Sequence, residues 1–294
     1  MRSRIWKLED ATARALLDQF VTARERMNAA LIDVWNRYGA GDTWSTRDAN
    51  FRTRTDALMS QITRSIDDLI KTSQDEALAA AERSYRAGYY GRAWVLDQGL
   101  RGGSDVSIPL LPDAAIRAAI LNPYGGNTFI DRYSGARDEF VALIRRSIVG
   151  SQIDGDSINA AMKRLAAALG LNITRGGADR GLRYRLEMIA RTEILRASNM
   201  GALAIYDANS DVLQGWEFIA TNDDRTCEEC GAADGKQYAF DDESDKPPLH
   251  PNCRCSVLPV LINSELSNRI AGQRQTYGDW ANQSGVGNDG GVFD

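Results

Sequence analysis

"MIARTEILRASNMGALAIY" (residues 188–206) decides the fold, because it predicts a helix at the boundary between helical patterns upstream and strand patterns downstream. A helix is expected from about Leu182 to Tyr206, since its apolar residues recur at helical spacing. These residues form one stripe: Leu182, Leu186, Ile189, Ala197 and Met200. Glu193 lies on the same stripe. Gly201 weakens the helix but is expected to permit the close approach of a neighbouring segment.

A carboxylate on a core-facing stripe is costly unless it is paired or hydrogen-bonded. We therefore expect Glu193 to join a buried structural network, with Arg191, Asn199, Asp224 and Arg225 as its other candidate members. The alternative is catalysis, with Glu193 and Arg191 in an open cleft. The exposure of Glu193 separates the two interpretations.

Upstream of this helix the chain is also expected to be helical. Residues 1–100 alternate apolar and charged positions at helical spacing, as in "WKLEDATARALLDQFVTARERMNAALIDVWNRY" (6–38). The glycines and prolines of 101–113 predict a linker, and 114–262 form the next domain. Within that domain, Ser157 is a candidate N-cap and Gly170 a candidate C-cap of one helix.

Downstream of the helix the pattern changes to strands. Trp216, Phe218 and Ala220 alternate with other residues as in a short strand, and Asp234-Gly235 is typical of a two-residue hairpin. "CSVLPV" (255–260) predicts a final strand. The tail 263–294 is polar and glycine-rich, and is expected to be flexible. The predicted fold class is therefore mainly α with a small β module (α+β): a long helical N-terminal region, a helical central block and a C-terminal Cys/His-bearing β-hairpin module at 216–262.

Composition limits the function classes. Hydrophobic content of 43% and charged content of 26% are typical of a globular protein, and no apolar run is long enough to cross a membrane. The start of the chain lacks a signal core, so we expect a reducing cytoplasm, which disfavours stable disulfides. A net charge of −5 argues against binding nucleic acid through bulk charge.

Charge is nevertheless uneven along the chain. Eight basic residues outnumber three acidic ones from 160 to 200, whereas nine acidic residues outnumber two basic ones from 222 to 245. The simpler interpretation is solvated helix faces and acidic loops. The candidate contacts to DNA phosphates are Arg175, Arg180, Arg183 and Arg185.

All four cysteines and the only histidine lie within 29 residues, in "RTCEEC" (225–230) and "LHPNCRC" (249–255). Cys227 and Cys230 are spaced so that one turn presents both sulfurs to a tetrahedral ion, and His250 and Cys253 repeat that spacing. Cys255 is a fifth candidate ligand, although zinc takes four. Thiolates with an imidazole favour zinc over magnesium or calcium.

Three interpretations of this cluster stay open: a structural zinc site, reduced cysteines packed as small apolar residues, or disulfides. A catalytic zinc of the nucleotide-deaminase type is disfavoured because Thr226, not proline, precedes Cys227, and because Pro251 and Asn252 follow His250.

Three segments in this order resemble the signature of the Mu F-like minor head proteins, the phage head morphogenesis family: "ARTEILRASNMG" (190–201), "TNDDRTCEECGAADGK" (221–236) and "PPLHPNCRC" (247–255). The resemblance covers about residues 140–260, with Ala233 standing where the family often has leucine. The matching positions are Arg191, Thr192, Glu193, Asn199, Gly201, Asp224, Arg225, Thr226, Cys227, Cys230, Asp234, Gly235, His250, Pro251, Asn252, Cys253, Arg254 and Cys255.

The resemblance implies a non-enzymatic minor structural protein of a tailed double-stranded DNA phage. It implies a place in the head interior of the virion, reached from the host cytoplasm during assembly. The implied partners are the portal protein, the major capsid protein or scaffold, and packaged DNA without sequence preference, with no membrane. We expect residues 1–100 to dock on the portal or capsid. The alternatives are an enzyme acting on nucleic acid or nucleotide, and a zinc-ribbon DNA-binding module.

Overall fold

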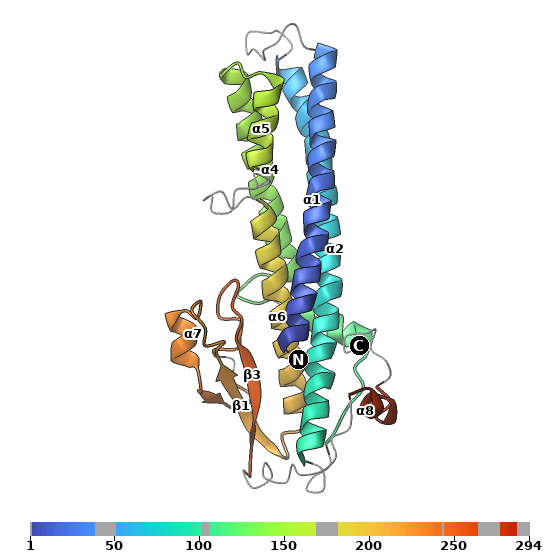
Figure 1. Cartoon of the computed structure of the whole chain (residues 1–294), viewed down its shortest axis with the longest axis vertical. Coiled ribbons are helices and arrows are strands. Elements are labelled where there is room, and N and C mark those ends of the chain that lie inside the picture. Colours follow the sequence, from blue (N-terminus) through green and yellow to red (C-terminus); the bar gives the residue numbers. More distant parts are fainter. Residues whose placement is uncertain are drawn as a thin grey trace. The chain divides into compact units, whose positions relative to one another are not determined.

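A computed structural model of the chain describes residues 2–38, 51–100, 106–168, 182–242, 244–263 and 277–286. It confirms the predicted fold class, because long helices are combined with one small antiparallel sheet (Figure 1). The helices are α1 (Arg2–Tyr38), α2 (Phe51–Leu100), α3 (Asp113–Leu121), α4 (Phe129–Ile153), α5 (Ile158–Ala168), α6 (Leu182–Asp207), α7 (Glu228–Ala233) and α8 (Tyr277–Gln283). The strands are β1 (Leu213–Ile219), β2 (Gln237–Tyr238) and β3 (Ser256–Leu261).

The chain divides into two compact units that are discontinuous in sequence. Unit 1 contains residues 1–10, 77–122 and 190–294, and unit 2 contains 11–76 and 123–189. The sequence instead predicted consecutive segments. The difference arises because α1, α2 and α6 are each long enough to contribute to both units, which a reading along the chain does not reveal.

Unit 2 consists of helices packed through large apolar side chains. Gln19 of α1 accepts a hydrogen bond from Ser73 of α2, and Arg26 pairs with Asp68, so these two helices run antiparallel. Thr55 of α2 donates to Gln152 of α4, and Asp67 of α2 pairs with Arg137 of α4, so these two helices also run antiparallel. Fully buried residues line these helices: Leu16, Phe20, Met27, Leu58, Ile62, Ile66, Phe129, Tyr133 and Ile144.

Two helix caps support unit 2. Thr128 and Asp131 form a capping box at the start of α4, in which the Thr128 side chain and the Asp131 carboxylate each accept a backbone N–H. Ser157 accepts a hydrogen bond from the Ala160 N–H at 3.3 Å, as an N-cap of α5 does. The expected C-cap, Gly170, lies outside the described residues.

In unit 1, α2 and α6 cross at very short distance. A Cβ atom on Gly201 would lie 2.2 Å from the Tyr85 carbonyl oxygen, and one on Gly88 would lie 2.0 Å from the Ser198 oxygen. The Ser84 hydroxyl donates to the Ile194 carbonyl at 2.7 Å across the same crossing. Gly201 therefore has the role expected from the sequence, with Gly88 as its counterpart on α2.

The sheet of unit 1 has the order β2-β1-β3, with both neighbours antiparallel to β1. Trp216 pairs with Tyr238 on one side and with Pro259 on the other. The predicted two-residue hairpin at Asp234-Gly235 is a different turn, because helix α7 precedes it rather than a strand. Gly235 adopts a left-handed φ of 77° there, and the Asp234 carboxylate accepts the Ala220 N–H at 2.7 Å.

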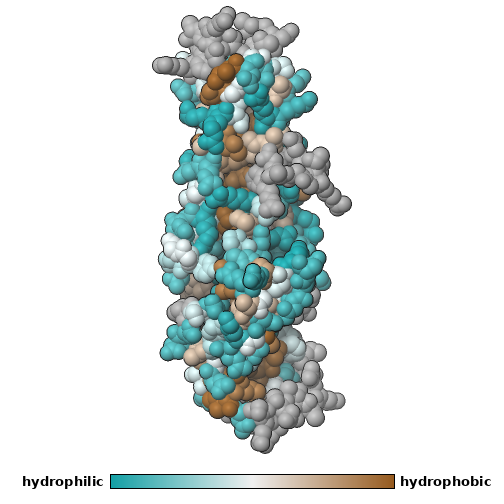
Figure 2. Space-filling model, turned by 90° about the vertical axis from the view of Figure 1, so that its left-hand side faces the viewer, coloured by the Kyte–Doolittle hydropathy of each residue, from teal (hydrophilic) through white to brown (hydrophobic). Residues whose placement is uncertain are grey.

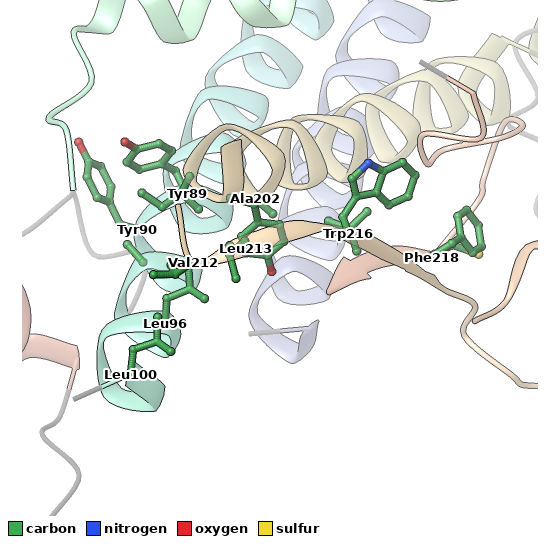
Figure 3. Packing of buried hydrophobic residues seen from close by; sticks show 14 of the residues in the cluster. Tyr89, Tyr90, Leu96, Leu100, Ala202, Val212, Leu213, Trp216 and Phe218 are labelled. Carbon is green, nitrogen blue, oxygen red and sulfur yellow. The ribbon is translucent and has the colours of Figure 1, made fainter. Parts of the chain in front are cut away.

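One apolar cluster joins the sheet to α2 and α6 (Figure 3). Tyr89, Tyr90, Leu96 and Leu100 come from α2, and Trp216 and Phe218 of β1 are fully buried. Cys230, Cys253 and Cys255 belong to the same cluster. Part of the tail that we expected to be flexible also enters it, because α8 places Trp280 there with only 2% of its surface exposed.

The second half of the predicted linker is held against this cluster. The Asn209 side-chain oxygen accepts the Ser107 N–H at 2.8 Å, and the Asn209 side-chain nitrogen donates to the Ser107 carbonyl at 2.9 Å. The Tyr89 hydroxyl donates to the Pro109 carbonyl at 2.8 Å. Residues 101–105 lie outside the described part.

Hydrophilic residues predominate on the face drawn in Figure 2, with apolar residues in several patches among them. Single large apolar side chains at a surface are normal for soluble domains and identify no site by themselves. Among the described residues, no helix combines the length and apolar content that a membrane crossing requires.

Candidate metal centre and its support on helix α6

Helix α6 supports the loop that carries His250 and Cys253. Thr192 accepts a hydrogen bond from the Asn252 N–H at 3.0 Å, where the Asn252 backbone is left-handed with a φ of 61°. Two turns later, the Asn199 amide donates to the Cys255 carbonyl at 3.0 Å. Both side chains are buried. The loop is therefore fixed at two points on α6, seven residues apart.

Glu193 lies between these two contacts and is 1% exposed. Its carboxylate accepts a hydrogen bond from Arg196 Nε at 2.8 Å, and Arg196 also donates to the Ile120 carbonyl. The guanidinium is buried as well, so the pair is desolvated and depends on these hydrogen bonds. Burial and pairing are what a structural role predicts, rather than an open catalytic cleft.

The network differs from the predicted one in its members. Arg196, which the prediction missed, is the partner of Glu193, although its i,i+3 spacing on a helix was a usable signal. Arg191 instead lies near acidic residues of α1, at 3.9 Å from Glu9 and 3.4 Å from Asp10. Asn199 holds the loop rather than an acid.

The other two expected members, Asp224 and Arg225, are exposed. They lie in a turn organised by Asp223, whose carboxylate accepts the Arg225 N–H at 3.0 Å and pairs with the Arg254 guanidinium at 2.6 Å. The hydrogen bond with Arg254 holds the pKa of Asp223 well below its ordinary value. This ion pair links the first cysteine segment to the second.

Glu9 is a second buried acid among the described residues, and the prediction from sequence missed it. It is 6% exposed, and burial raises its pKa from 4.5 to about 7, although the nearby Arg191 and Arg254 act in the opposite direction. Its position on the first helix, far from the motifs in sequence, gave no signal of this environment.

The structure brings the five predicted metal ligands together. Cys227, Cys230 and His250 form one group whose sulfur and nitrogen atoms lie within 4.8 Å of one another, and Cys230, Cys253 and Cys255 form a second. Cys230 belongs to both groups. All four cysteines are free thiols, so the disulfide interpretation does not describe this structure.

Two turns of the backbone position the side chains of Cys227, Cys230, His250 and Cys253. Cys227 is the N-cap of α7, and its sulfur accepts the Cys230 N–H at 3.4 Å. The Cys253 N–H donates to the His250 carbonyl at 3.1 Å. The sulfurs of Cys227 and Cys230 each lie 3.2 Å from His250 Nε2, and the sulfurs of Cys230 and Cys253 are 3.8 Å apart.

The buried thiols differ in pKa because they lie close together. Burial raises the pKa of Cys230 to about 12, whereas the hydrogen bond from the Cys255 side chain lowers the pKa of Cys253 to about 5. The same interaction with Cys253, together with burial, raises the pKa of Cys255. The sulfurs cannot all ionise side by side unless a cation compensates their charge. A bound divalent ion deprotonates the thiols that coordinate it, so this donor set fits a metal.

A surface depression of about 550 Å³ opens over the cluster. It is lined by Cys227, Glu228, Glu229, Ala232 and His250. Its two glutamates are exposed and provide negative charge beside two of the ligands, which suits the entry of a cation. The types of donor atom, their spacing and access through this depression together mean that the cluster could hold a metal ion.

The candidate DNA contacts are less available than the sequence suggested. Arg183 pairs with Glu187 at 2.9 Å, and Arg185 pairs with Glu139. Arg175 and Arg180 lie outside the described residues. The basic excess of this region is therefore offset in part by acids of α4 and α6.

Comparison with known proteins supports the family resemblance that was predicted from the three sequence motifs. Residues 143–258 match the family model described as Phage Mu protein F like protein. No curated protein and no solved structure gives a significant match to the chain. The matched segment contains Thr192, Glu193 and Asn199 of α6 together with all five candidate ligands. Over these residues the chain is therefore similar to the Mu F-like family, the family that its motifs predicted.

Proposed function

We propose that this protein is a non-enzymatic minor structural protein of a tailed double-stranded DNA phage, acting in head morphogenesis. The observation that carries the proposal is the family match over residues 143–258. The buried and paired state of Glu193 supports a structural rather than a catalytic role for the α6 motif. The protein would act in the head interior, associated with the portal and with the capsid protein or scaffold.

Within this role, the Cys/His cluster would hold one structural zinc ion. Thiolate and imidazole ligands favour zinc, and a structural ion supplies folding free energy to a small module. The ion would hold together the chain segments around Cys230 and Cys253, which lie far apart in sequence. The hydrogen bonds of Thr192 and Asn199 would then hold the ordered loop against α6.

Location in the particle tests the proposal. In a phage that encodes this chain, quantitative mass spectrometry of purified heads should find a few copies per particle, and they should remain after tails are removed. A nonsense mutation in the gene should reduce the yield of filled heads. A chain absent from purified particles, or a mutant with normal heads, would contradict the proposal.

Cross-linking on the same heads tests which region docks. Lys7 and Lys71 lie on α1 and α2, whereas Lys236 and Lys246 lie in the module that carries the cysteines. If the N-terminal helices dock, amine-reactive cross-links to the portal or capsid protein should come from Lys7 and Lys71. Links from Lys236 and Lys246 alone would assign docking to the module instead.

Contact with packaged DNA would be weak and without sequence preference. Binding that rests on phosphate contacts releases counterions, so its affinity should fall steeply as salt is raised. Titration of a mixed-sequence duplex at several salt concentrations measures this slope. Tight, sequence-selective binding at high salt would favour a DNA-binding module over the structural role.

A further inference from the structure

Five candidate ligands surround a site where zinc takes four. We propose that the shell consists of Cys227, Cys230, His250 and Cys253, and that Cys255 stays outside it as a buried thiol in contact with the ligands. This inference rests on the structural ion proposed above and names its coordination.

The distances between neighbouring ligand atoms suit tetrahedral coordination. Zinc–sulfur bonds of about 2.3 Å and zinc–nitrogen bonds of about 2.0 Å place two ligand sulfurs about 3.8 Å apart, and a sulfur about 3.5 Å from a nitrogen. The sulfurs of Cys230 and Cys253 are 3.8 Å apart. His250 Nε2 lies 3.2 Å from the sulfurs of Cys227 and Cys230. Cys253 is not in the group of Cys227 and His250, so binding of the ion would draw its sulfur toward them.

His250 is oriented as a ligand. Its Nδ1 lies 2.9 Å from the Pro251 carbonyl oxygen, which can only accept, so Nδ1 carries the proton. The lone pair is then on Nε2, the atom that faces both sulfurs. A backbone carbonyl that fixes the second ring nitrogen is the usual support of a metal-bound imidazole. A shell of four thiolates would leave this oriented nitrogen without an ion.

The backbone distinguishes Cys253 from Cys255. Cys253 belongs to the turn of His250, through the hydrogen bond from its N–H to the His250 carbonyl. Cys255 instead directly precedes β3, whose Ser256 pairs with Ile219 of β1. Its carbonyl is held by Asn199 of α6. The ligand turn thus presents His250 and Cys253 together, whereas Cys255 is fixed to the sheet and to α6.

Neither grouping nor burial distinguishes Cys255 from Cys253, so the choice between them rests on the backbone. The sulfurs of both are grouped with that of Cys230 and not with Cys227 and His250. Cys255 and Cys253 are each 3% exposed. A thiol in this place donates to a ligand sulfur and fills the apolar cluster behind the site.

Two serine variants of equal burial provide the test. Full-length protein prepared under reducing conditions should contain one zinc per chain by elemental analysis. Cys255→Ser should keep that stoichiometry, with affinity reduced by no more than about 10- to 100-fold, as expected for a group that supports a ligand. Cys253→Ser should lose more affinity than Cys255→Ser, measured by competition with a chromophoric chelator.

Spectroscopy counts the thiolates in the shell directly, first in the wild type and then in the two variants. X-ray absorption at the zinc edge of the wild type should fit three sulfurs and one nitrogen. After cobalt substitution, the thiolate charge-transfer intensity should be unchanged in Cys255→Ser and lower by about one third in Cys253→Ser. That fraction follows from three thiolates in the shell.

The outcomes separate the two proposals. Four sulfurs in the wild type, or a Cys255→Ser variant that loses charge-transfer intensity while His250→Ala keeps the metal, would overturn this ligand set and leave the zinc ion standing. Wild-type protein that stays metal-free when reduced and supplied with zinc would overturn the ion itself. Neither result bears on whether the chain is found in phage heads.

Discussion

Helix α6 has two environments along its length. From Leu182 to Ile189, in unit 2, only Leu182, Leu186 and Ile189 are buried, which is the single stripe of an amphipathic helix. From Thr192 to Asn199, in unit 1, every residue is buried, polar ones included. The same helix is therefore held by ordinary apolar packing in one unit and by specific polar and close backbone contacts in the other.

This difference indicates where substitutions matter. Large apolar side chains can be exchanged for others of similar volume at modest cost. A buried carboxylate or a glycine under a backbone oxygen has no such substitute. We therefore expect matched changes to cost far more in unit 1 than in unit 2.

The largest expected effect is that of Glu193→Ala. Removing this carboxylate takes away the negative charge paired with the buried Arg196 guanidinium, which should cost about 3–5 kcal/mol of unfolding free energy. Glu139→Ala in unit 2 is the matched control, because Glu139 also pairs with an arginine but its side chain is 63% exposed. The control should cost less than about 1 kcal/mol.

Urea unfolding followed by circular dichroism measures both variants. Equal losses for Glu193→Ala and Glu139→Ala would remove the distinction between the two environments. An unaffected Glu193→Ala stability with a lost enzymatic activity would instead favour the catalytic alternative.

The next largest effect is expected at the crossing of α2 and α6. In Gly201→Ala the new Cβ would lie 2.2 Å from the Tyr85 oxygen, so the helices must move apart, at a cost of about 2–3 kcal/mol. Gly135→Ala in α4 is the control, since nothing lies within 4 Å of its Cβ position. It should raise stability by about 0.5–1 kcal/mol.

The two alanine variants should therefore move the thermal midpoint in opposite directions. A Gly201→Ala protein as stable as the wild type would show that the crossing is not closely packed in solution.

A smaller effect, limited to part of the pH range, is expected at Glu9. Its pKa is raised from 4.5 to about 7, so the folded state holds a proton that the unfolded state has released between these values. The contribution of Glu9 to stability is thus fully present below pH 4.5 and is lost as pH rises to about 7. A shift of this size corresponds to a loss of about 3 kcal/mol.

Glu9→Gln keeps the shape and removes the titration. Its unfolding free energy should change less between pH 5 and pH 8 than that of the wild type, and it should be the more stable protein at pH 8. Parallel stability profiles for the two proteins would mean that Glu9 has an ordinary pKa and that water reaches it.

Much of the fold could be predicted because helical periodicity is a local property. The helix expected from about Leu182 to Tyr206 runs from Leu182 to Asp207, and the strand expected around Trp216 is β1. The five candidate ligands were identifiable because thiols and an imidazole are rare and their spacing is informative. The prediction of a two-residue hairpin at Asp234-Gly235 was wrong. The dipeptide indicates a left-handed turn, but it does not indicate whether a helix or a strand precedes that turn.

Sequence alone determined the residue types that this protein has available: amphipathic helices, one cluster of cysteine and histidine, and a motif that includes Glu193. Only the tertiary structure decided which groups meet. Arg196 rather than Arg191 pairs with Glu193, Thr192 and Asn199 hold the ligand loop, and Glu9 is buried beside residues about 180 positions away. Periodicity specifies which face of a helix is apolar, but the partners of a buried polar group depend on distances between segments that no local pattern encodes.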